Sequence, residues 1–348
     1  MTRGPGDAAA AQGSGGAAAD RGPGGGSAGG GGWAHPRVLV AHCKMAPQLV
    51  PRIETEVPVR STGSVLDLDL AQRAEVEVLV GFQFPPGVLA ELPGLRWLHL
   101  TGTGTDHLAA AGLAPQVLVT SSARVPVRSV AEYAVSALLM LLKDFPALAA
   151  RPQLRPWYTS SALLLHGSTV LVLGAGRIGR VVVELLSALG ARCVAVTRDG
   201  ARPVAGAART VGVADLVTVA AAADHLVCCL PGTAQTANVV GAAVLAALPR
   251  HAVLVNVGRA ATVDDAALHA ALRGGRIRGA FLDVHRVEPL PSDDPVWSVP
   301  NLVVSPHCAF AFPDEPGEVG RVFLENLADL RAGRVPRDAV EVASREGS

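Results

Sequence analysis

Neither charge is in excess in this 348-residue chain, because 30 Lys and Arg residues balance 30 Asp and Glu residues. Without a net positive charge, the chain has no sequence-wide attraction to nucleic acid or anionic lipid. Long apolar runs are also missing, since none approaches the ~18 uninterrupted residues that a membrane span needs. We therefore expect a soluble chain of about two domains, at ~150 residues each, with its selectivity confined to a local site.

C-x-x-C spacing is missing as well. The five cysteines stand at positions 43, 193, 228, 229 and 308. An odd number of cysteines without such spacing is typical of reduced thiols in a cytoplasmic protein and argues against a disulfide framework. We expect a cytoplasmic protein without a metal site.

Large apolar side chains are almost absent from residues 1–34, which consist mainly of Gly, Ala, Ser, Pro and Asp. Such a segment cannot bury enough surface to order itself. It also lacks the basic start and the Leu-rich centre of a secretory signal peptide. We expect a disordered tail over 1–34 and a polar tail over 336–348.

Between these tails, short apolar runs alternate with helical stretches, a pattern typical of doubly wound parallel sheets. The second series of runs is the more hydrophobic, as expected for strands buried on both faces. We predict an α/β protein with two Rossmann-like doubly wound domains, one over 129–307 and a smaller, discontinuous one over 35–128 and 308–335. The expected strands lie at 38–40, 76–80, 95–100, 117–120, 169–173, 193–196, 225–230, 252–257, 277–283 and 302–304.

Two helices have local signals. Ser129 and Glu132 have the S-x-x-E spacing of a capping box, which predicts a helix from about Val130 to Leu142. Another helix is expected over Val319 to Leu330.

A glycine-rich loop directly follows the expected strand at 169–173. Gly174, Gly176 and Gly179 have G-x-G-x-x-G spacing, and an apolar helical pattern begins at Arg177 and Ile178. The first glycine permits a tight turn, the second lets the backbone approach a pyrophosphate, and the third lets helix and strand pack closely. Although a lone G-x-G-x-x-G is more often an ordinary loop, its place between strand and helix favours a dinucleotide site.

The next strand should end at the adenosine ribose, where an NAD site usually has an acidic residue about 20 positions on. Thr197 stands at that place, and Arg198 follows it. A hydroxyl and a guanidinium suit a 2′-phosphate, which a carboxylate would repel. We therefore expect NADP in preference to NAD; the alternative is that Arg198 is merely solvated and Asp199 binds the ribose.

Three further segments each place an ionisable residue just after an expected strand. They are 254–260 (LVNVGRA), 279–290 (GAFLDVHRVEPL) and 301–307 (NLVVSPH). Together with the glycine loop, they closely resemble the D-isomer-specific 2-hydroxyacid dehydrogenase family, and within it the glyoxylate and hydroxypyruvate reductases. The resemblance spans about Val38 to Leu330. It implies that 129–307 is the dinucleotide-binding domain, that the discontinuous domain binds the substrate, and that the active site lies in the cleft between them.

The resemblance implies a catalytic set of Arg259, Glu288 and His307. A guanidinium can hold the carboxylate of a 2-keto acid and stabilise charge on its carbonyl oxygen. A histidine can supply the proton that this oxygen needs on reduction, while a carboxylate against its other ring nitrogen fixes the tautomer. Taken singly, each residue is more often a solvated charge or a turn residue, but all three in this order favour catalysis.

The resemblance also implies contacts from loops. Thr103 and Gly104 match the loop whose N–H groups meet the substrate carboxylate, with an ordinary glycine turn as the alternative. Pro231, Thr236 and Val257 are expected beside the cofactor. Asp283 matches an aspartate near the nicotinamide carboxamide, although a strand-end Asp can simply cap a turn.

Two features depart from the family pattern. His285 and Arg286 stand where Phe and an acidic residue are frequent, and Phe310 and Phe312 stand where small or hydroxyl residues are usual. The phenylalanines either narrow the pocket or pack at the domain junction. Only 41 residues follow His307, so we expect no regulatory domain there.

The sequence thus predicts an oxidoreductase that transfers a hydride between NADPH or NADH and a small 2-keto acid, giving the D-2-hydroxy acid. A homodimer is expected from the resemblance alone. The alternative is a dinucleotide-sensing corepressor or scaffold of the same fold, without significant turnover.

Overall fold

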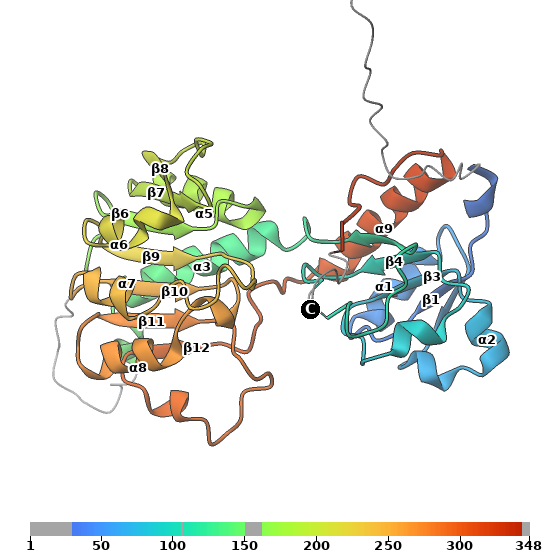
Figure 1. Ribbon diagram of the computed structural model, residues 1–348, viewed down its shortest axis with the longest axis horizontal. Helices are drawn as coiled ribbons and strands as arrows, with labels where there is room; N and C mark the ends of the chain where they lie inside the picture. Colours follow the sequence, from blue (N-terminus) through green and yellow to red (C-terminus); the bar gives the residue numbers. More distant parts are fainter. Residues whose placement is uncertain (1–29, 106, 150–161, 343–348) are drawn as a thin grey trace, which may run out of the picture.

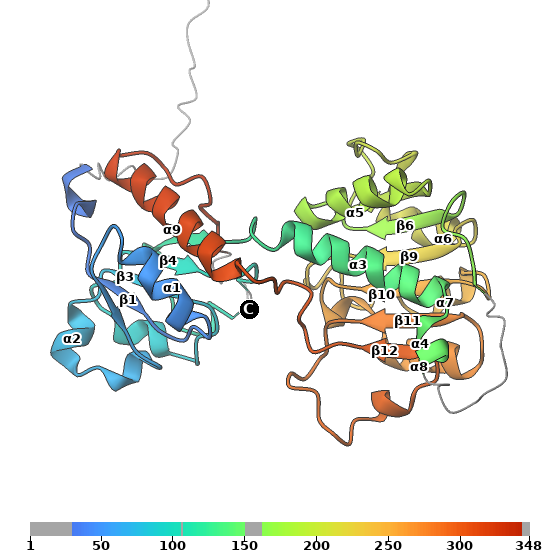
Figure 2. The same cartoon turned by 180° about the vertical axis from the view of Figure 1, so that it is seen from behind.

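Two parallel sheets form two lobes, which the chain joins twice (Figures 1 and 2). The computed structural model describes residues 30–105, 107–149 and 162–342. The predicted fold class, two α/β units with parallel sheets, is confirmed. Within the described residues, no helix is both long and apolar enough to cross a membrane.

The first sheet has five strands in the order β2-β1-β3-β4-β5, and its neighbouring strands are parallel. Sequence analysis located four of them and missed β2, an edge strand whose side chains are half-buried or exposed and which therefore lacks an apolar run. The strands are β1 (Val38–Val40), β2 (Val59–Ser61), β3 (Val78–Gly81), β4 (Trp97–Leu100) and β5 (Leu118–Ser121).

The second sheet has seven parallel strands in the order β12-β11-β10-β9-β6-β7-β8. β8 lies at the edge, is only partly buried, and was missed for the same reason as β2. Because β6 pairs with both β7 and β9, the chain order reverses there, and ligands of doubly wound sheets bind at such a point. The strands are β6 (Thr169–Leu173), β7 (Arg192–Thr197), β8 (Arg209–Gly212), β9 (His225–Cys228), β10 (Val253–Asn256), β11 (Gly279–Leu282) and β12 (Leu302–Val304).

Helices cover both faces of the second sheet. Val170 and Val172 of β6 pack into the core under α3 and α5, whereas Leu171 and Leu173 pack into the core on the opposite face. Helices α3 and α5 lie in front of the sheet in Figure 2. Helices α6, α7 and α8 cover the opposite face and lie in front of the sheet in Figure 1. The helices are α3 (Val127–Leu142), α4 (Phe145–Ala149), α5 (Arg177–Ala188), α6 (Leu216–Ala220), α7 (Ala242–Ala247) and α8 (Asp265–Arg273), and short 3-10 turns lie at Val213–Asp215, Ala260–Thr262 and Pro295–Ser298.

The first sheet is covered partly by a helix from late in the chain. Helix α9 packs beside α1 in Figure 2, and the ring of Phe323 in α9 stacks on Trp97 at a centroid distance of 4.8 Å. The prediction of a helix at 319–330 falls inside α9. The elements of this lobe are α1 (Ala46–Ile53), α2 (Leu70–Ala74), α9 (Glu315–Arg331) and 3-10 turns at Gly30–Trp33, Val65–Asp67 and Val88–Glu91.

The structure describes packed residues inside both predicted tails, 1–34 and 336–348, so each tail is shorter than predicted. Trp33 is only 5 % exposed and meets Trp97 edge-on at 6.1 Å, so ordered chain begins before residue 35. At the other end, Asp338 is 7 % exposed and pairs with Arg124 at 3.2 Å. Residues 1–29 and 343–348, the rest of the two predicted tails, lie outside the described residues.

The capping box predicted at Ser129 is wrong. Helix α3 begins at Val127, with Pro126 at the N-cap position, so Ser129 lies inside the helix. The Ser129 hydroxyl donates to the Ala309 carbonyl oxygen at 2.8 Å, and Glu132 accepts from Arg128 at 2.7 Å. Ser129 thus links the two segments that cross between the lobes.

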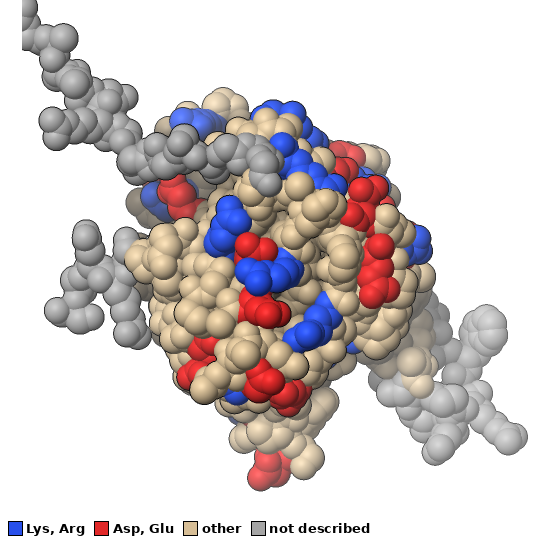
Figure 3. Space-filling model, turned by 90° about the vertical axis from the view of Figure 1, so that its right-hand side faces the viewer, with Lys and Arg blue, Asp and Glu red and all other residues tan. Residues whose placement is uncertain are grey.

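Surface charge is mixed where the first lobe is seen from its end. Figure 3 shows acidic and basic side chains interspersed among uncharged ones over that face. Near α9, ion pairs such as Arg52–Asp314 and Glu56–Arg331, each at 3.6 Å, neutralise charge locally. The equal numbers of positive and negative side chains in the whole chain are therefore matched by a local balance of charge on this face.

Candidate active site

The glycine loop has the backbone geometry that a dinucleotide needs. Gly174 has a φ of +89°, which favours glycine. A Cβ on Gly179 would lie 1.9 Å from the Gly174 carbonyl oxygen, so only glycine allows α5 to approach β6 this closely. A Cβ on Gly176 would meet no described atom within 4 Å, which leaves open space at the N-terminus of α5. The loop therefore fits a pyrophosphate, which a helix N-terminus also favours electrostatically.

Arg177 and Ile178 begin helix α5 directly after this loop. Arg177 is exposed, and the half-buried Ile178 packs against the core under α3 and α5. The sequence predicts both residues as cofactor-binding, and that contact stays a prediction.

The end of β7 carries the residues predicted to bind the adenosine ribose. The Thr197 hydroxyl accepts from the Gly200 N–H at 3.0 Å, and Asp199 accepts from the Ala201 N–H at 2.9 Å. Arg198 is exposed between them. The carboxylate of Asp199 thus caps its own turn, while the guanidinium is accessible.

The loop after β9 is shaped by a threonine. The Thr236 hydroxyl donates to the Pro231 carbonyl oxygen at 2.6 Å and accepts from the Thr233 N–H at 2.9 Å. The next strand end along the sheet is anchored by the Val257 N–H, which donates to the Cys228 carbonyl oxygen at 3.1 Å. Pro231 and Thr236 therefore follow β9, which neighbours β6, and Val257 follows β10, the next strand of the sheet.

Arg259 lies on a turn that a buried amide holds in place. The side chain of Asn256, which is 0 % exposed, accepts from the Gly258 N–H at 3.0 Å and donates to the Arg259 carbonyl oxygen at 3.1 Å. The Thr262 hydroxyl donates to the same oxygen at 2.7 Å. A Cβ on Gly258 would lie 2.5 Å from the Leu230 carbonyl oxygen. These contacts explain why Asn and Gly occur at positions 256 and 258, directly before Arg259.

Glu288 and His307 form a hydrogen-bonded pair, as the sequence predicted. The His307 Nδ1 lies 2.8 Å from the Glu288 Oε2, and the two side chains are 39 % and 35 % exposed. Partial burial acts to raise the pKa of Glu288, but hydrogen bonds from the His285 N–H and from His307 outweigh it and lower that pKa. Glu288 is therefore ionised and faces the imidazole as a carboxylate.

A second histidine, which sequence analysis noted only as a departure, supports this pair. The His285 N–H donates to Glu288 Oε1 at 2.9 Å, and His285 Nε2 lies 2.8 Å from the Ser305 carbonyl oxygen. That oxygen also accepts from the His307 N–H at 3.0 Å. His307 itself has a φ of +51°, a conformation that a non-glycine residue adopts only under constraint.

Asp283 holds the segment around His307 from the core side. It is 1 % exposed and accepts hydrogen bonds from the Ser305 hydroxyl at 2.5 Å and from the Cys308 and Ala309 N–H groups at 3.0 Å each. These contacts match the alternative of a strand-end carboxylate that caps a turn. Its contact with a nicotinamide stays a prediction.

The other departures also have places in the structure. Arg286 pairs with Asp265 at 2.5 Å and donates to the Asn238 side chain at 3.0 Å, so it ties neighbouring loops together. The Phe310 ring lies edge-on to the His307 ring at a centroid distance of 6.2 Å and is 38 % exposed. Phe310 therefore limits the space beside the imidazole.

The predicted substrate loop follows β4 in the other lobe. Thr103 is exposed and Gly104 is buried. The Ser121 hydroxyl supports the loop by donating to the Gly102 carbonyl oxygen at 2.9 Å. A Cβ on Gly102 would lie 2.6 Å from the Phe82 ring, so the loop rests against an aromatic side chain. The structure thus brings Glu288 and His307 together and places Thr103 and Gly104 on a separate lobe.

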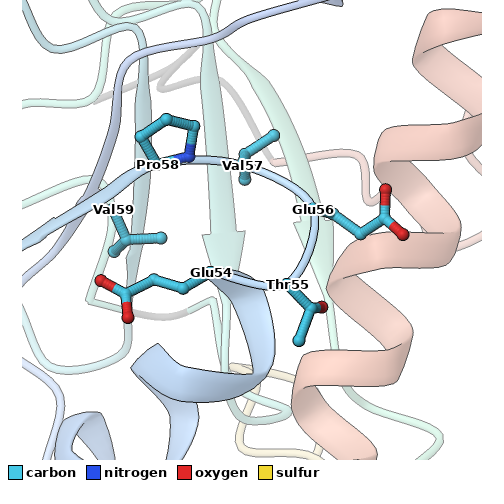
Figure 4. A pocket seen from close by; sticks show the side chains of 6 residues that line it. All are labelled: Glu54, Thr55, Glu56, Val57, Pro58 and Val59. Carbon is cyan, nitrogen blue, oxygen red and sulfur yellow. The ribbon is translucent and has the colours of Figure 1, made fainter.

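A surface hollow lies elsewhere, at the turn between α1 and β2 (Figure 4). Its lining is the run 54–59, in which Glu56 points toward α9 and pairs with Arg331 at 3.6 Å. None of the predicted catalytic or cofactor residues lines it.

Known proteins resemble this chain over most of its length. Residues 135–309 match the family model described as "D-isomer specific 2-hydroxyacid dehydrogenase, NAD binding domain". The chain is 30 % identical to glyoxylate/hydroxypyruvate reductase B of Citrobacter koseri, over 87 % of this chain and 97 % of that protein.

It is also 32 % identical to D-3-phosphoglycerate dehydrogenase of Mycobacterium tuberculosis, over 88 % of this chain but only 59 % of that longer protein. Among solved structures, it superposes on the NADPH-dependent glyoxylate/hydroxypyruvate reductase of Sinorhizobium meliloti in complex with NADP and malonate. The TM-score is 0.74, with 30 % identity, 88 % of this chain covered and 97 % of that one.

Proposed function

Because the chain belongs to the D-isomer-specific 2-hydroxyacid dehydrogenase family, we propose that it reversibly reduces a small 2-keto acid to the D-2-hydroxy acid with NADPH or NADH. The observation that carries this proposal is the bond of 2.8 Å between His307 Nδ1 and the Glu288 carboxylate. It leaves Nε2 as the ring nitrogen that can exchange a proton with a substrate.

The cofactor would lie at the glycine loop. Gly174, Gly176 and Gly179 would hold its pyrophosphate, with Pro231, Thr236 and Val257 beside it. When bound, the nicotinamide supplies the hydride. The accessible Arg198 favours a 2′-phosphate, because an exposed guanidinium can pair with that group. We therefore propose NADPH as the preferred reductant.

The substrate would lie between the lobes, in contact with both. Arg259 would hold the keto acid and stabilise the negative charge that develops on its carbonyl oxygen. The N–H groups of the exposed loop at Thr103 and Gly104 would bind the carboxylate. This placement requires the domain boundaries predicted from the sequence, a cofactor domain over 129–307 and a discontinuous substrate domain.

His307 would then give a proton to the carbonyl oxygen. The imidazolium that does so is stabilised by the adjacent Glu288 carboxylate, whose lowered pKa keeps it ionised at neutral pH. In the reverse direction, the neutral ring accepts the proton of the hydroxyl. The same residue thus acts as acid and as base.

The test is a substrate panel. We expect oxidation of NADPH in the presence of glyoxylate or hydroxypyruvate, because proteins of similar sequence and structure bear those substrates in their names. Pyruvate and a bulkier keto acid complete the panel, and chiral analysis of the product should give the D isomer. Tight cofactor binding without reduction of any keto acid would contradict the proposal and favour the dinucleotide-sensing alternative.

Assembly and location belong to the same proposal. A homodimer is supported by the family resemblance, and sedimentation at micromolar concentration tests it. A cytoplasmic location is supported by the five cysteines, all of them free thiols in the structure.

A further inference from the structure

We propose that His285 is a positioning residue for His307, because it closes a ring of hydrogen bonds around the catalytic imidazole. The inference rests on the proposed function, in which His307 is the acid and base. Its role is distinct from that of Glu288, which touches the imidazole directly.

The ring has four links, and each joins neighbouring groups of the site. The His285 N–H donates to Glu288 Oε1 at 2.9 Å, and Glu288 Oε2 meets His307 Nδ1 at 2.8 Å. The His307 N–H donates to the Ser305 carbonyl oxygen at 3.0 Å, and His285 Nε2 meets the same oxygen at 2.8 Å. His285 is therefore bonded to both partners that orient His307.

The acceptors in this ring of hydrogen bonds decide which imidazole nitrogens of His285 and His307 carry protons. A carbonyl oxygen and a carboxylate can only accept, so His285 Nε2 and His307 Nδ1 must both be donors. The neutral tautomer of His285 is thereby fixed with its proton on Nε2. This assignment follows from geometry and does not depend on substrate.

The constraint is needed because His307 has a φ of +51°. A non-glycine residue adopts this region only where surrounding contacts enforce it. The Asp283 carboxylate holds this segment by accepting hydrogen bonds from Ser305, Cys308 and Ala309. The His285 ring adds a hydrogen bond to the Ser305 carbonyl oxygen, which also accepts from the His307 N–H. Losing the ring removes that bond, so we expect the turn that carries His307 to be held less tightly.

The charged groups around His285 do not offer it another function. Glu288 is already bonded to its backbone, Asp283 is occupied by three donors, and the adjacent Arg286 pairs with Asp265 at 2.5 Å. The contact of the ring itself is with an uncharged carbonyl. Donation of a hydrogen bond, and not charge, is therefore the proposed role.

Two variants separate these roles. His285→Phe keeps an aromatic ring but removes the donor, whereas His285→Gln keeps an N–H donor that never becomes cationic. We expect kcat for keto-acid reduction to fall about tenfold or more in His285→Phe, because small misplacement of a catalytic group is costly. KM and cofactor affinity should change by less than about twofold, the pattern of an interaction made for the transition state.

The Gln variant should recover most of this loss, and His269→Gln on α8 serves as the control for loss of a histidine. Thermal unfolding of each variant shows whether it folds. Full activity in a folded His285→Phe, or a Gln variant as impaired as the Phe variant, overturns the proposal.

A measurement without turnover keeps this inference separate from the proposed function. Ring ¹⁵N chemical shifts of the protein alone report which nitrogen of His285 is protonated. We expect the Nε2–H tautomer in the parent. An Nδ1–H tautomer overturns the proposed ring of hydrogen bonds, even if the enzyme is active. An Nε2–H tautomer in a protein that reduces no keto acid rejects the proposed function and leaves the ring of hydrogen bonds intact.

Discussion

The two sheets contribute differently to the proposed site. The edge of the second sheet carries Arg259, Glu288 and His307, each held by hydrogen bonds at distances near 3 Å. The first sheet contributes a loop of Thr and Gly residues after β4, in which Thr103 is exposed. In the proposed function, chemistry that depends on charge and protons would belong to the second lobe, while the first lobe would offer backbone groups and shape.

The largest expected effect tests whether the second lobe carries the chemistry. Arg259→Ala should lower kcat/KM for keto-acid reduction by about a thousandfold, because it removes a preorganised charge beside the carbonyl. Cofactor affinity, measured by calorimetry, should be unchanged, since the glycine loop is separate. The matched control is the exposed Arg250→Ala. Substantial reduction by the Arg259 variant would exclude this role.

The next effect concerns cofactor preference, which we assign to residues at the end of β7 in the second sheet. The parent should prefer NADPH over NADH by roughly tenfold to a hundredfold, the value of one charge-assisted contact of about 1.5–3 kcal/mol. The double variant Thr197→Asp, Arg198→Ala should abolish this preference, as measured by kcat/KM with both cofactors at saturating keto acid. If the parent prefers NADH, or the variant still prefers NADPH, Asp199 becomes the candidate ribose ligand.

A smaller effect tests the pairing of Glu288 with His307. The carboxylate of Glu288, whose pKa is lowered, would stabilise the imidazolium that the proposed reduction requires. Glu288→Gln removes that stabilisation, and the high-pH limb of the rate profile should move to lower pH by about one unit. An unchanged profile, with chemistry shown to limit the rate, would make Glu288 a turn residue only.

The smallest effect belongs to the first lobe and concerns stability. Burial raises the pKa of Glu315 at the start of α9 from 4.5 to about 7. The folded state therefore binds more protons than the unfolded state between these values, and stability falls as pH rises through that window. Glu315→Gln should raise the Tm at pH 8 relative to the parent and flatten its decline from pH 5.

The matched control for this prediction is Glu318→Gln. Glu318 lies one turn further along α9, and its pKa is lowered chiefly by a hydrogen bond from Arg321. Its removal should not raise the Tm at pH 8. A Tm of the Glu315 variant that follows the parent at every pH would show that its carboxyl is not destabilising.

The same contrast explains what the sequence could predict. Central strands such as β6 and β10 are buried along their whole length and mostly apolar, and the sequence predicted them, whereas the edge strands β2 and β8 were missed because one side of them faces solvent. Glu288 and His307 were found through family motifs. The bond from His285 to Ser305 was not, because it joins residues 20 apart whose approach depends on the pairing of β11 with β12.

The contact between Trp97 and Phe323 has a consequence for synthesis in the cell. Phe323 belongs to α9, which the ribosome makes after every strand of the second sheet. The part of the first sheet that α9 covers beside α1 therefore stays exposed while the whole second lobe is translated, and such uncovered apolar surface is prone to aggregate. The lobe that begins first is thus completed last.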